Sequence, residues 1–562
     1  MQKAWLNIRR RDNGFSAVEV LLAATVFGVL VTGIIGALIY GRAGTAAAGD
    51  RQRAVFLAEE GIEAVRNIGG ASYSNLTDGT FGLAQSGGAW VLSGSSDTNG
   101  AYTRQVLIAA AGIDRKAITV TVTWPQQGGG TGIVTLNSRM SNWSATLPVT
   151  GGPIMMAYSK TTTTPFYRTW NGSAWSAEAS AQAVTGNINY IVLKSSRTRN
   201  EAILGVQTST GAIYIQTWNG TSWSNLTQVG TGPTTTRSFD IAYEKNTDNA
   251  VIAFTPSSGS ADFAYRTWNG TTLSSATTIT APPTTGALNW LELRQNPLSA
   301  SNEIAMIMLD ANADVYGMRW TGSAWNTMGT AAVWDATAAT GNKKAIDVEY
   351  EQTSGEIMFM WGDGVATDQY YRTWNGTTLS AATLLDIAAE GGVAEWIQLA
   401  ARPNSNEILL GVQDAGADLN TRKWSGSAWD AAAQHAEHSA AVENIANRTF
   451  DIVYETHSAN PGKAWLLWGN GSTVSAKSWS GTAWGSAATL TGTDDTSFIR
   501  LRADSASGVL FAGLYEDNSS ATDDITEFRL SGGGSTWSSE NTIWAGPTTV
   551  TPVHFRIDIA TP

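Results

Sequence analysis

The sequence has no cysteine, and only four of its 562 residues are histidine. No disulfide can form. Two of the histidines, His435 and His438, lie close together in a polar stretch. No third metal ligand follows them at helical spacing, so the pattern favours a solvated loop over a metal site. We therefore expect no enzyme activity, no bound metal and no cofactor.

Charged residues are also scarce, at 15% of the chain, and the formal net charge is −12. Outside the first 14 residues the basic side chains do not cluster, so nucleic acid is not an expected partner of the C-terminal part. Glycine, serine and threonine dominate the turns, which is typical of an extracellular all-β domain with many short strands. The chain length predicts two domains with large buried cores.

A long apolar run does occur, at residues 15–40, where Glu19 is the only ionisable residue before Tyr40. About 26 residues at ~1.5 Å each are enough to cross ~30 Å of hydrocarbon. Lys3 and the three arginines at 9–11 precede this run, which predicts a single membrane pass with the amino terminus inside. A secretory signal peptide is the alternative, but it would have a shorter apolar core and no carboxylate at its start.

Gly14 and Phe15 stand at the border between polar and apolar residues, and Glu19 follows four residues later. This arrangement resembles the prepilin signature of type IV pilins and type II secretion pseudopilins. The resemblance implies that prepilin peptidase cuts between Gly14 and Phe15, that the new amino group of Phe15 is methylated, and that other pilin subunits are partners. A carboxylate in hydrocarbon needs a cation. In the family the residue matching Glu19 offsets the terminal amine of a neighbouring subunit, although a lone Glu could also be accidental.

Beyond residue 40 the apolar positions recur near helical spacing among charged ones up to Ile68. This pattern predicts one helix over residues 15–67, ended by Gly69-Gly70. Strand-like runs follow at 102–108, 117–124 and 132–138 within a sheet over residues 100–145. The resemblance implies an α+β pilin module at 15–146, after a leader peptide at 1–14. Residues 147–153 hold two prolines and two glycines and are interpreted as a linker rather than as a sortase motif, which they also spell.

A motif is repeated from residue 154 to the end: aromatic-x-x-Trp-Asn/Ser/Thr-Gly-Ser/Thr-x-Trp/Leu, with a degenerate eighth copy at Leu530. Two apolar β-like runs precede each copy, so each repeat supplies the four strands of a propeller blade. The first repeat lacks its first strand, and residues 553–560 match the missing strand in pattern. We predict an all-β, eight-bladed propeller over 154–562 whose shared blade joins both ends and removes the open edge. The longest connections run from each hairpin to the first strand of the next repeat, which predicts that the first strand of each blade is the innermost one.

Asn-Gly in the motif predicts a two-residue type I′ turn that pairs Trp170 with Ser173 and Arg168 with Trp175. Both tryptophans would then share one face, on which Arg168 stacks, as would the equivalent Arg266, Arg372 and Arg422. We interpret the aromatic side chains as a packing signature, with a carbohydrate platform as the alternative. The candidates are Trp170, Trp175, Trp218, Trp223, Trp268, Trp320, Trp374, Trp424 and Trp479.

Two acidic pairs, Asp310 with Asp314 and Asp414 with Asp418, occupy corresponding turns between strands. They are interpreted as turn formers, with weak Ca²⁺ binding as the alternative.

The parts together favour a minor or tip pilin that assembles through its first helix and displays the propeller as an adhesin for a cell-surface glycan or protein. Before assembly it would lie in the cytoplasmic membrane, and afterwards in an extracellular pilus or at the cell surface. One alternative is a structural filament subunit with the propeller as coat or spacer. Another is a surface glycosidase, although no set of arginines, acids and tyrosine typical of sialidase-like propellers is recognisable.

Overall fold

The computed structural model describes residues 16–111, 115–126, 129–141, 152–160, 162–280, 286–330, 332–339, 342–365, 367–387, 392–431, 436–443, 447–471, 473–490, 495–517, 523–546 and 557–562. The chain divides into two compact units, Met1–Pro148 and Val149–Pro562. Gly14, Phe15 and most of the expected linker lie outside the described residues.

The first unit begins with one 55-residue helix, α1 (Ala17–Ala71). Ser16 caps its amino end: the Ser16 hydroxyl accepts the N–H of Val18, and Glu19 accepts the N–H of Ser16 at 3.0 Å, which forms a capping box. The helix continues through Gly69 and Gly70, where we expected it to end. Gly69 is buried, and a Cβ there would lie 2.9 Å from Leu76 Cδ1, so this glycine serves close packing rather than helix termination.

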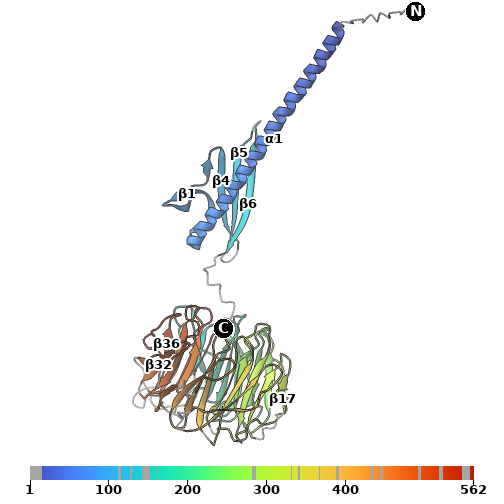
Figure 1. Ribbon diagram of the computed structural model, residues 1–562. Coiled ribbons are helices and arrows are strands. Elements are labelled where there is room, and N and C mark those ends of the chain that lie inside the picture. The colour runs from blue at the N-terminus through green and yellow to red at the C-terminus, as the bar shows by residue number, and fades with distance from the viewer. Residues whose placement is uncertain are drawn as a thin grey trace, which may run out of the picture. The chain divides into compact units, whose positions relative to one another are not determined.

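A six-stranded antiparallel sheet accompanies the helix (Figure 1). Its strands are β1 (Gly79–Ser86), β2 (Ala89–Ser93), β3 (Asp97–Asn99), β4 (Tyr102–Ala110), β5 (Arg115–Pro125) and β6 (Thr131–Ser141). The order is β2-β1-β4-β5-β6, with β3 paired to β4, and the short helix η1 (Tyr73–Asn75) precedes β1. The three predicted runs lie in β4, β5 and β6. The predicted sheet omitted β1 to β3, which are short or mostly half-buried and exposed, so they lack a strong apolar alternation.

Small residues bring the second half of α1 close to this sheet. Ala54, Ala58, Gly61 and Ala64 are buried at helical spacing, and a Cβ on Gly61 would lie 2.8 Å from Val120 Cγ1. Arg104 of β4 then links sheet and helix, because its guanidinium contacts Asp97 at 2.8 Å and Glu60 of α1 at 2.9 Å. The amphipathic half of the helix is thus held by both apolar and ionic contacts.

The second unit contains, among its described residues, eight antiparallel sheets of four strands each, set side by side like propeller blades (Figure 1). Seven of them use consecutive strands: β10 (Ile188–Ser195), β11 (Ala202–Thr208), β12 (Ala212–Trp218) and β13 (Trp223–Thr231); β14 (Phe239–Tyr243), β15 (Ala250–Phe254), β16 (Phe263–Trp268) and β17 (Thr277–Ile279); β18 (Leu288–Gln295), β19 (Ile304–Asp310), β20 (Val315–Trp320) and β21 (Trp325–Thr327); β22 (Ile346–Tyr350), β23 (Ile357–Gly362), β24 (Gln369–Trp374) and β25 (Thr383–Leu385); β26 (Ala394–Ala401), β27 (Ile408–Asp414), β28 (Leu419–Trp424) and β29 (Ala436–Ser439); β30 (Phe450–Tyr454), β31 (Ala464–Gly469), β32 (Val474–Trp479) and β33 (Ala488–Leu490); and β34 (Thr496–Ala503), β35 (Leu510–Asp517), β36 (Asp523–Leu530) and β37 (Asn541–Ala545).

The eighth sheet combines the two ends of the unit. It has the order β38-β7-β8-β9, in which β38 (Ile557–Ala560) joins β7 (Met155–Ser159), β8 (Pro165–Thr169) and β9 (Ala179–Ser180). Ile557 pairs with Tyr158 and Ala560 with Met155 in an antiparallel register. The first strands of successive sheets contact one another, and β38 contacts both β34 and β10.

The eight sheets alternate between two kinds, a pattern that the sequence interpretation did not resolve. The first strands β10, β18, β26 and β34 each carry a register shift near their start. The first strands β14, β22, β30 and β38 each carry a buried aspartate, at Asp240, Asp347, Asp451 and Asp558. Each aspartate accepts a backbone N–H from a strand of the neighbouring sheet, such as that of Leu193 on Asp558 at 2.9 Å. The structural repeat is therefore a pair of sheets.

The hairpin at Asn171-Gly172 differs from the predicted two-residue turn. Trp170 pairs with Trp175, not with Ser173. The Asn171 side-chain oxygen accepts two backbone N–H groups across the loop, and Gly172 has the positive φ of 98°. An asparagine that satisfies the loop in this way does not need positive φ itself, so the hairpin takes a four-residue loop instead of a type I′ turn.

Candidate functional site

The exposed half of α1 is the first candidate site. Its large apolar side chains from Val18 to Tyr40 are exposed, and the helix is long and apolar enough to cross a membrane, with none of the apolar window buried within the chain. Glu19 lies at the start of this half, in the capping box with Ser16. The structure therefore shows a local role for Glu19 that the sequence interpretation did not consider.

The repeat tryptophans pack between neighbouring sheets. The ring of Tyr167 lies 5.4 Å from that of Trp218 and 5.7 Å from that of Trp223 in the next sheet. Tyr265, Tyr371 and Phe511 meet the tryptophan pairs 320/325, 424/429 and 170/175 in the same way. Of the candidates, Trp218, Trp223, Trp268, Trp320, Trp374, Trp424 and Trp479 are buried, whereas Trp170 and Trp175 are half-buried. These contacts close most of the ring faces to a ligand.

The arginines expected to stack on their own hairpins do not. Arg168 donates to the carbonyl oxygens of Ser176 and Ile543. Arg266 donates to Ser274, Arg372 lies over Trp334, and Arg422 pairs with Asp430. Charge-assisted hydrogen bonds are stronger than neutral ones, and for Arg168, Arg266 and Arg422 the chain between the last two strands of their own sheet supplies the acceptor oxygens. Other cations lie over the repeat tryptophans. They stand one residue later in the motif than the four arginines above, and each belongs to the sheet before that of its tryptophan: Arg319 lies over Trp374, Lys423 over Trp479 and Arg529 over Trp170.

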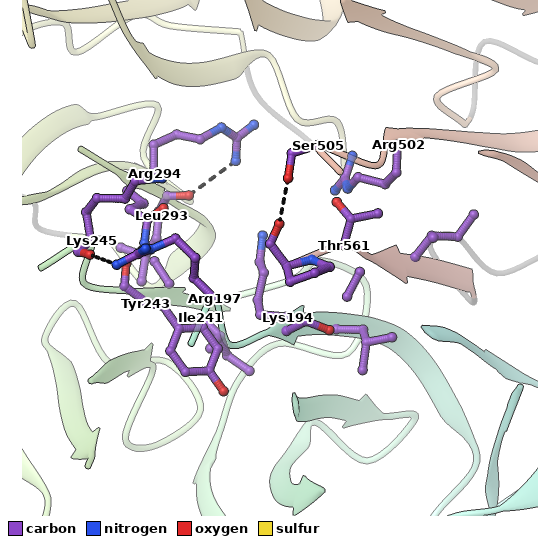
Figure 2. A pocket seen from close by; sticks show the side chains of 17 residues that line it. Lys194, Arg197, Ile241, Tyr243, Lys245, Leu293, Arg294, Arg502, Ser505 and Thr561 are labelled. Carbon is purple, nitrogen blue, oxygen red and sulfur yellow. Dashed lines mark hydrogen bonds between the residues drawn. The ribbon is translucent and has the colours of Figure 1, made fainter. Parts of the chain in front are cut away.

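The second candidate site is a pocket of about 400 Å³ at the ends of the first strands of several sheets (Figure 2). Three cationic side chains surround its opening: Lys194 of β10, Arg294 of β18 and Arg502 of β34. Arg197 and Lys245, from the segments after β10 and β14, add two more. We call these five residues the central cations. No aspartate or glutamate is among the 17 residues that line the pocket, but Pro562, the last residue of the sequence, also lines it and its carbonyl oxygen accepts the Ser505 hydroxyl at 3.4 Å.

The central cations are neutralised to very different degrees. Arg294 has three carboxylates close to it, those of Glu292 at 2.9 Å, Asp347 at 3.2 Å and Glu349 at 3.4 Å. Arg502 lies 3.5 Å from Asp558, a carboxylate that Arg500 contacts at 2.7 Å. Lys194 forms no ion pair with any residue in the described part of the chain.

Burial, and after it the neighbouring charges, shift the pKa values of these groups. Burial acts to raise the pKa of the Asp558 carboxyl, but Arg500, Arg502 and Lys194 outweigh burial and hold that pKa well below its usual range. Burial, and after it the charge of Arg500, lowers the pKa of Arg502 to about 10. Burial also lowers the pKa of Lys194, against the opposite effect of Asp240 and Asp558. Burial in this site thus disfavours the charged forms of both Arg502 and Lys194.

The cations of this pocket recur in every second repeat, so a comparison of each repeat with the next does not reveal them. When every second repeat is aligned, the equivalent position of the first strands β10, β18, β26 and β34 is occupied by Lys194, Arg294, Ala400 and Arg502. Three cations at one position of four equivalent innermost strands are the signal that was available. The fourth position, Ala400, carries no charge.

The acidic turns and the histidines do not add a metal site among the described residues. Asp310 accepts the N–H groups of Asn312 and Asp314, and Asp414 accepts those of Gly416 and Asp418. These carboxylates behave as turn formers. The His438 ring contacts the Thr421 hydroxyl at 2.8 Å and packs on Trp484, while His435 and His554 lie outside the described residues.

No protein-family model matches the chain, and no curated protein matches it. Among solved structures, a fungal lectin from Aleuria aurantia, described as a six-bladed β-propeller with a novel fucose recognition mode, is 12% identical with a TM-score of 0.36, over 64% of this chain and 96% of its own. The SapL1 lectin in complex with alpha methyl fucoside is 12% identical with a TM-score of 0.33, over 64% and 98%. The dihydro-heme d1 dehydrogenase NirN is 7% identical with a TM-score of 0.42, over 69% and 73%. At these levels the similarities assign neither a ligand nor an activity to this chain.

Proposed function

We propose that the protein is a pilin-like subunit that assembles through the exposed half of α1 and displays a carbohydrate-binding propeller at the cell surface. The observation that carries the proposal is the division of one helix into two halves. Residues 18–40 present large apolar side chains that are exposed in the part of the chain that the structure describes, while residues 54–68 pack on an antiparallel sheet. An apolar half of this length needs a membrane or other subunits to cover it.

In this proposal prepilin peptidase cleaves between Gly14 and Phe15, and the amino group of Phe15 is methylated. The subunit spans the cytoplasmic membrane once, with its amino terminus inside, before it joins a pilus. The charge of Glu19 then offsets the terminal amine of a neighbouring subunit. Its exposed position at the start of the helix supports this role, because the carboxylate is accessible to another chain.

The displayed head is, in the same proposal, an eight-bladed propeller closed by a shared blade. The eight four-stranded sheets and the pairing of β38 with β7 support it. Closure of this kind leaves no sheet edge open between the first and last blades. The pocket at the ends of the innermost strands supplies a concave site with convergent polar groups, which is the usual form of a small-ligand site.

Mass spectrometry of the amino-terminal peptide from the exported protein tests the assembly half of the proposal. The expected peptide begins at an N-methylated Phe15. A mature chain that keeps residues 1–14, or that begins at another residue, would overturn the pilin assignment.

Adhesion of cells that carry the full chain, compared with cells that carry a chain truncated after residue 153, tests the display half. Loss of adhesion with filaments still present on electron micrographs is expected. Unchanged adhesion would replace the adhesin proposal with a coat or spacer role.

A further inference from the structure

The pocket adjoins a dense group of buried charges on the innermost strands, and three of the central cations, Lys194, Arg294 and Arg502, belong to this group. The described cations of this group are Lys194, Arg237, Arg294, Lys344, Arg448, Arg500 and Arg502, and the described acids are Asp240, Glu292, Asp347, Glu349, Asp451 and Asp558. The acids contact the deeper cations and Arg294. The seven cations exceed the six acids by one, and the cation without an ion pair among the described residues is Lys194 at the pocket, next to Arg502, which shares Asp558 with Arg500.

Asp558 lies 3.5 Å from Arg502 and already accepts three other hydrogen bonds. It accepts the backbone N–H groups of Leu193 at 2.9 Å and Ile559 at 3.0 Å, and the Arg500 guanidinium at 2.7 Å. Arg502 itself donates to the carbonyl oxygen of Leu501 at 2.8 Å. A carboxylate holds about four hydrogen bonds, so Asp558 has little capacity left for Arg502 or Lys194.

We propose that this pocket binds the anionic group, carboxylate or sulfate, of an acidic sugar, with Lys194 and Arg502 as its direct partners. The inference rests on the proposed function of the propeller as a carbohydrate-binding head and narrows its ligand class. A guanidinium and an ammonium on two different strands would hold one anionic group from two sides.

The pocket's size and walls favour a sugar over a bare ion. A volume of about 400 Å³ is far larger than one sulfate needs and lies in the range of small-ligand sites. Ile241, Leu293 and Ile559 back the pocket as almost fully buried side chains, while Arg197 lies at the pocket as a polar group, as does Ser505, whose hydroxyl donates to Pro562. An anionic group bound at Lys194 and Arg502 therefore leaves room for the ring that carries it (Figure 2).

Titration calorimetry on the detergent-solubilised full chain tests the inference, with methyl glucuronoside and methyl glucoside as ligands that differ by one carboxylate. Glucose 6-sulfate and inorganic sulfate form the second pair. Each acidic sugar is expected to bind at least about tenfold tighter than methyl glucoside, with an affinity that falls as salt rises. Inorganic sulfate is expected to bind more weakly than glucose 6-sulfate.

Matched substitutions locate the site. Lys194→Gln and Arg502→Gln should each weaken binding of methyl glucuronoside about tenfold, whereas Lys194→Arg and Arg502→Lys, which keep the charge, should stay close to the original affinity. Arg42→Gln, an equal change of net charge on the exposed helix of the other unit, should have no effect. Circular dichroism of each variant verifies folding.

Equal binding of glucoside and glucuronoside, or unchanged binding in both Gln variants, would overturn the acidic-sugar inference and leave the carbohydrate-binding proposal in place. Inorganic sulfate that binds as tightly as glucose 6-sulfate would overturn the sugar part of the inference. If no sugar of any charge binds, the proposed carbohydrate function of the propeller itself fails.

Discussion

At the residue scale, Glu19 combines a local hydrogen bond with a charge. In the structure its carboxylate accepts the N–H of Ser16 and completes the capping box. Glutamine at the same position can make this hydrogen bond but carries no charge. Substitution of Glu19 can therefore distinguish a role in helix capping from a role in filament assembly.

Glu19→Gln is expected to leave the helix intact and to reduce filament assembly at least about tenfold, because an uncompensated terminal amine is costly to bury in an apolar environment. Filaments sheared from cells and quantified by immunoblot measure the effect, and circular dichroism verifies the helix. Glu19→Asp, which keeps the charge, is the control and should retain more assembly. Normal filament yield from Glu19→Gln would reduce Glu19 to a capping residue.

Asp558 of strand β38 forms ion pairs with Arg500 and Arg502 of β34. Its lowered pKa predicts how the stability of the propeller depends on pH. A carboxyl whose pKa is lower in the folded chain than its unfolded value of about 3.9 contributes stability above that value. The contribution is lost as the pH falls below about 4 toward the folded pKa. Burial opposes this shift, and the cations Arg500, Arg502 and Lys194 produce it.

Asp558→Asn is therefore expected to lower the free energy of unfolding of the propeller at pH 7 by about 3 kcal/mol, since it leaves buried cations without a partner. Between pH 4 and pH 2.5 the variant should lose less stability than the original protein. Urea unfolding followed by tryptophan fluorescence measures both values. Parallel pH curves for the two proteins would contradict this account of Asp558.

At the element scale, the contact between α1 and its sheet depends on small residues. Gly61 faces Val120, so a larger side chain must push helix and strand apart, while Gly70 has open space around its Cα. Both lie in the same helix and differ only in what a side chain would meet.

Gly61→Leu is expected to destabilise the first unit by about 2 kcal/mol through overpacking. Gly70→Leu should leave its stability unchanged or raise it by up to about 1 kcal/mol, because leucine favours the helix more than glycine does. Hydrogen exchange of the amides at residues 54–68 reports the difference. Equal protection of the helix in both variants would show that close approach at Gly61 is unimportant.

At the scale of the whole molecule, the pairing of β38 with β7 joins the ends of a unit of about 400 residues. Deletion of residues 557–562 removes the first strand of that sheet and exposes the edge of β7. The propeller should then melt at a clearly lower temperature and aggregate through the open edge. Removal of Pro562 alone keeps the pairing and should preserve the melting temperature. Differential scanning calorimetry and light scattering distinguish the outcomes, and equal melting of all three chains would argue against closure by β38.

Much of the fold could be predicted from local patterns, and the failures have identifiable causes. β4, β5 and β6 occur where apolar alternation predicted strands, whereas β1 to β3 lack that alternation. The hairpin pairing was wrong because the Asn171 side chain bonds to the loop backbone, which a rule based on φ alone does not capture. The pocket was missed because Lys194, Arg294 and Arg502 are more than 90 residues apart in the chain.

The sequence by itself determined the elements, since periodicity, glycine turns and the repeat depend on neighbours within a few residues. It indicated the long apolar helix, the repeated four-stranded unit and a terminal strand that completes the first repeat. Only the tertiary structure decided which side chains meet. The alternation of two kinds of sheet places cations from distant repeats around one opening, and Asp558 beside them already accepts three hydrogen bonds. That balance of charge is a property of packing in three dimensions, which no local pattern encodes.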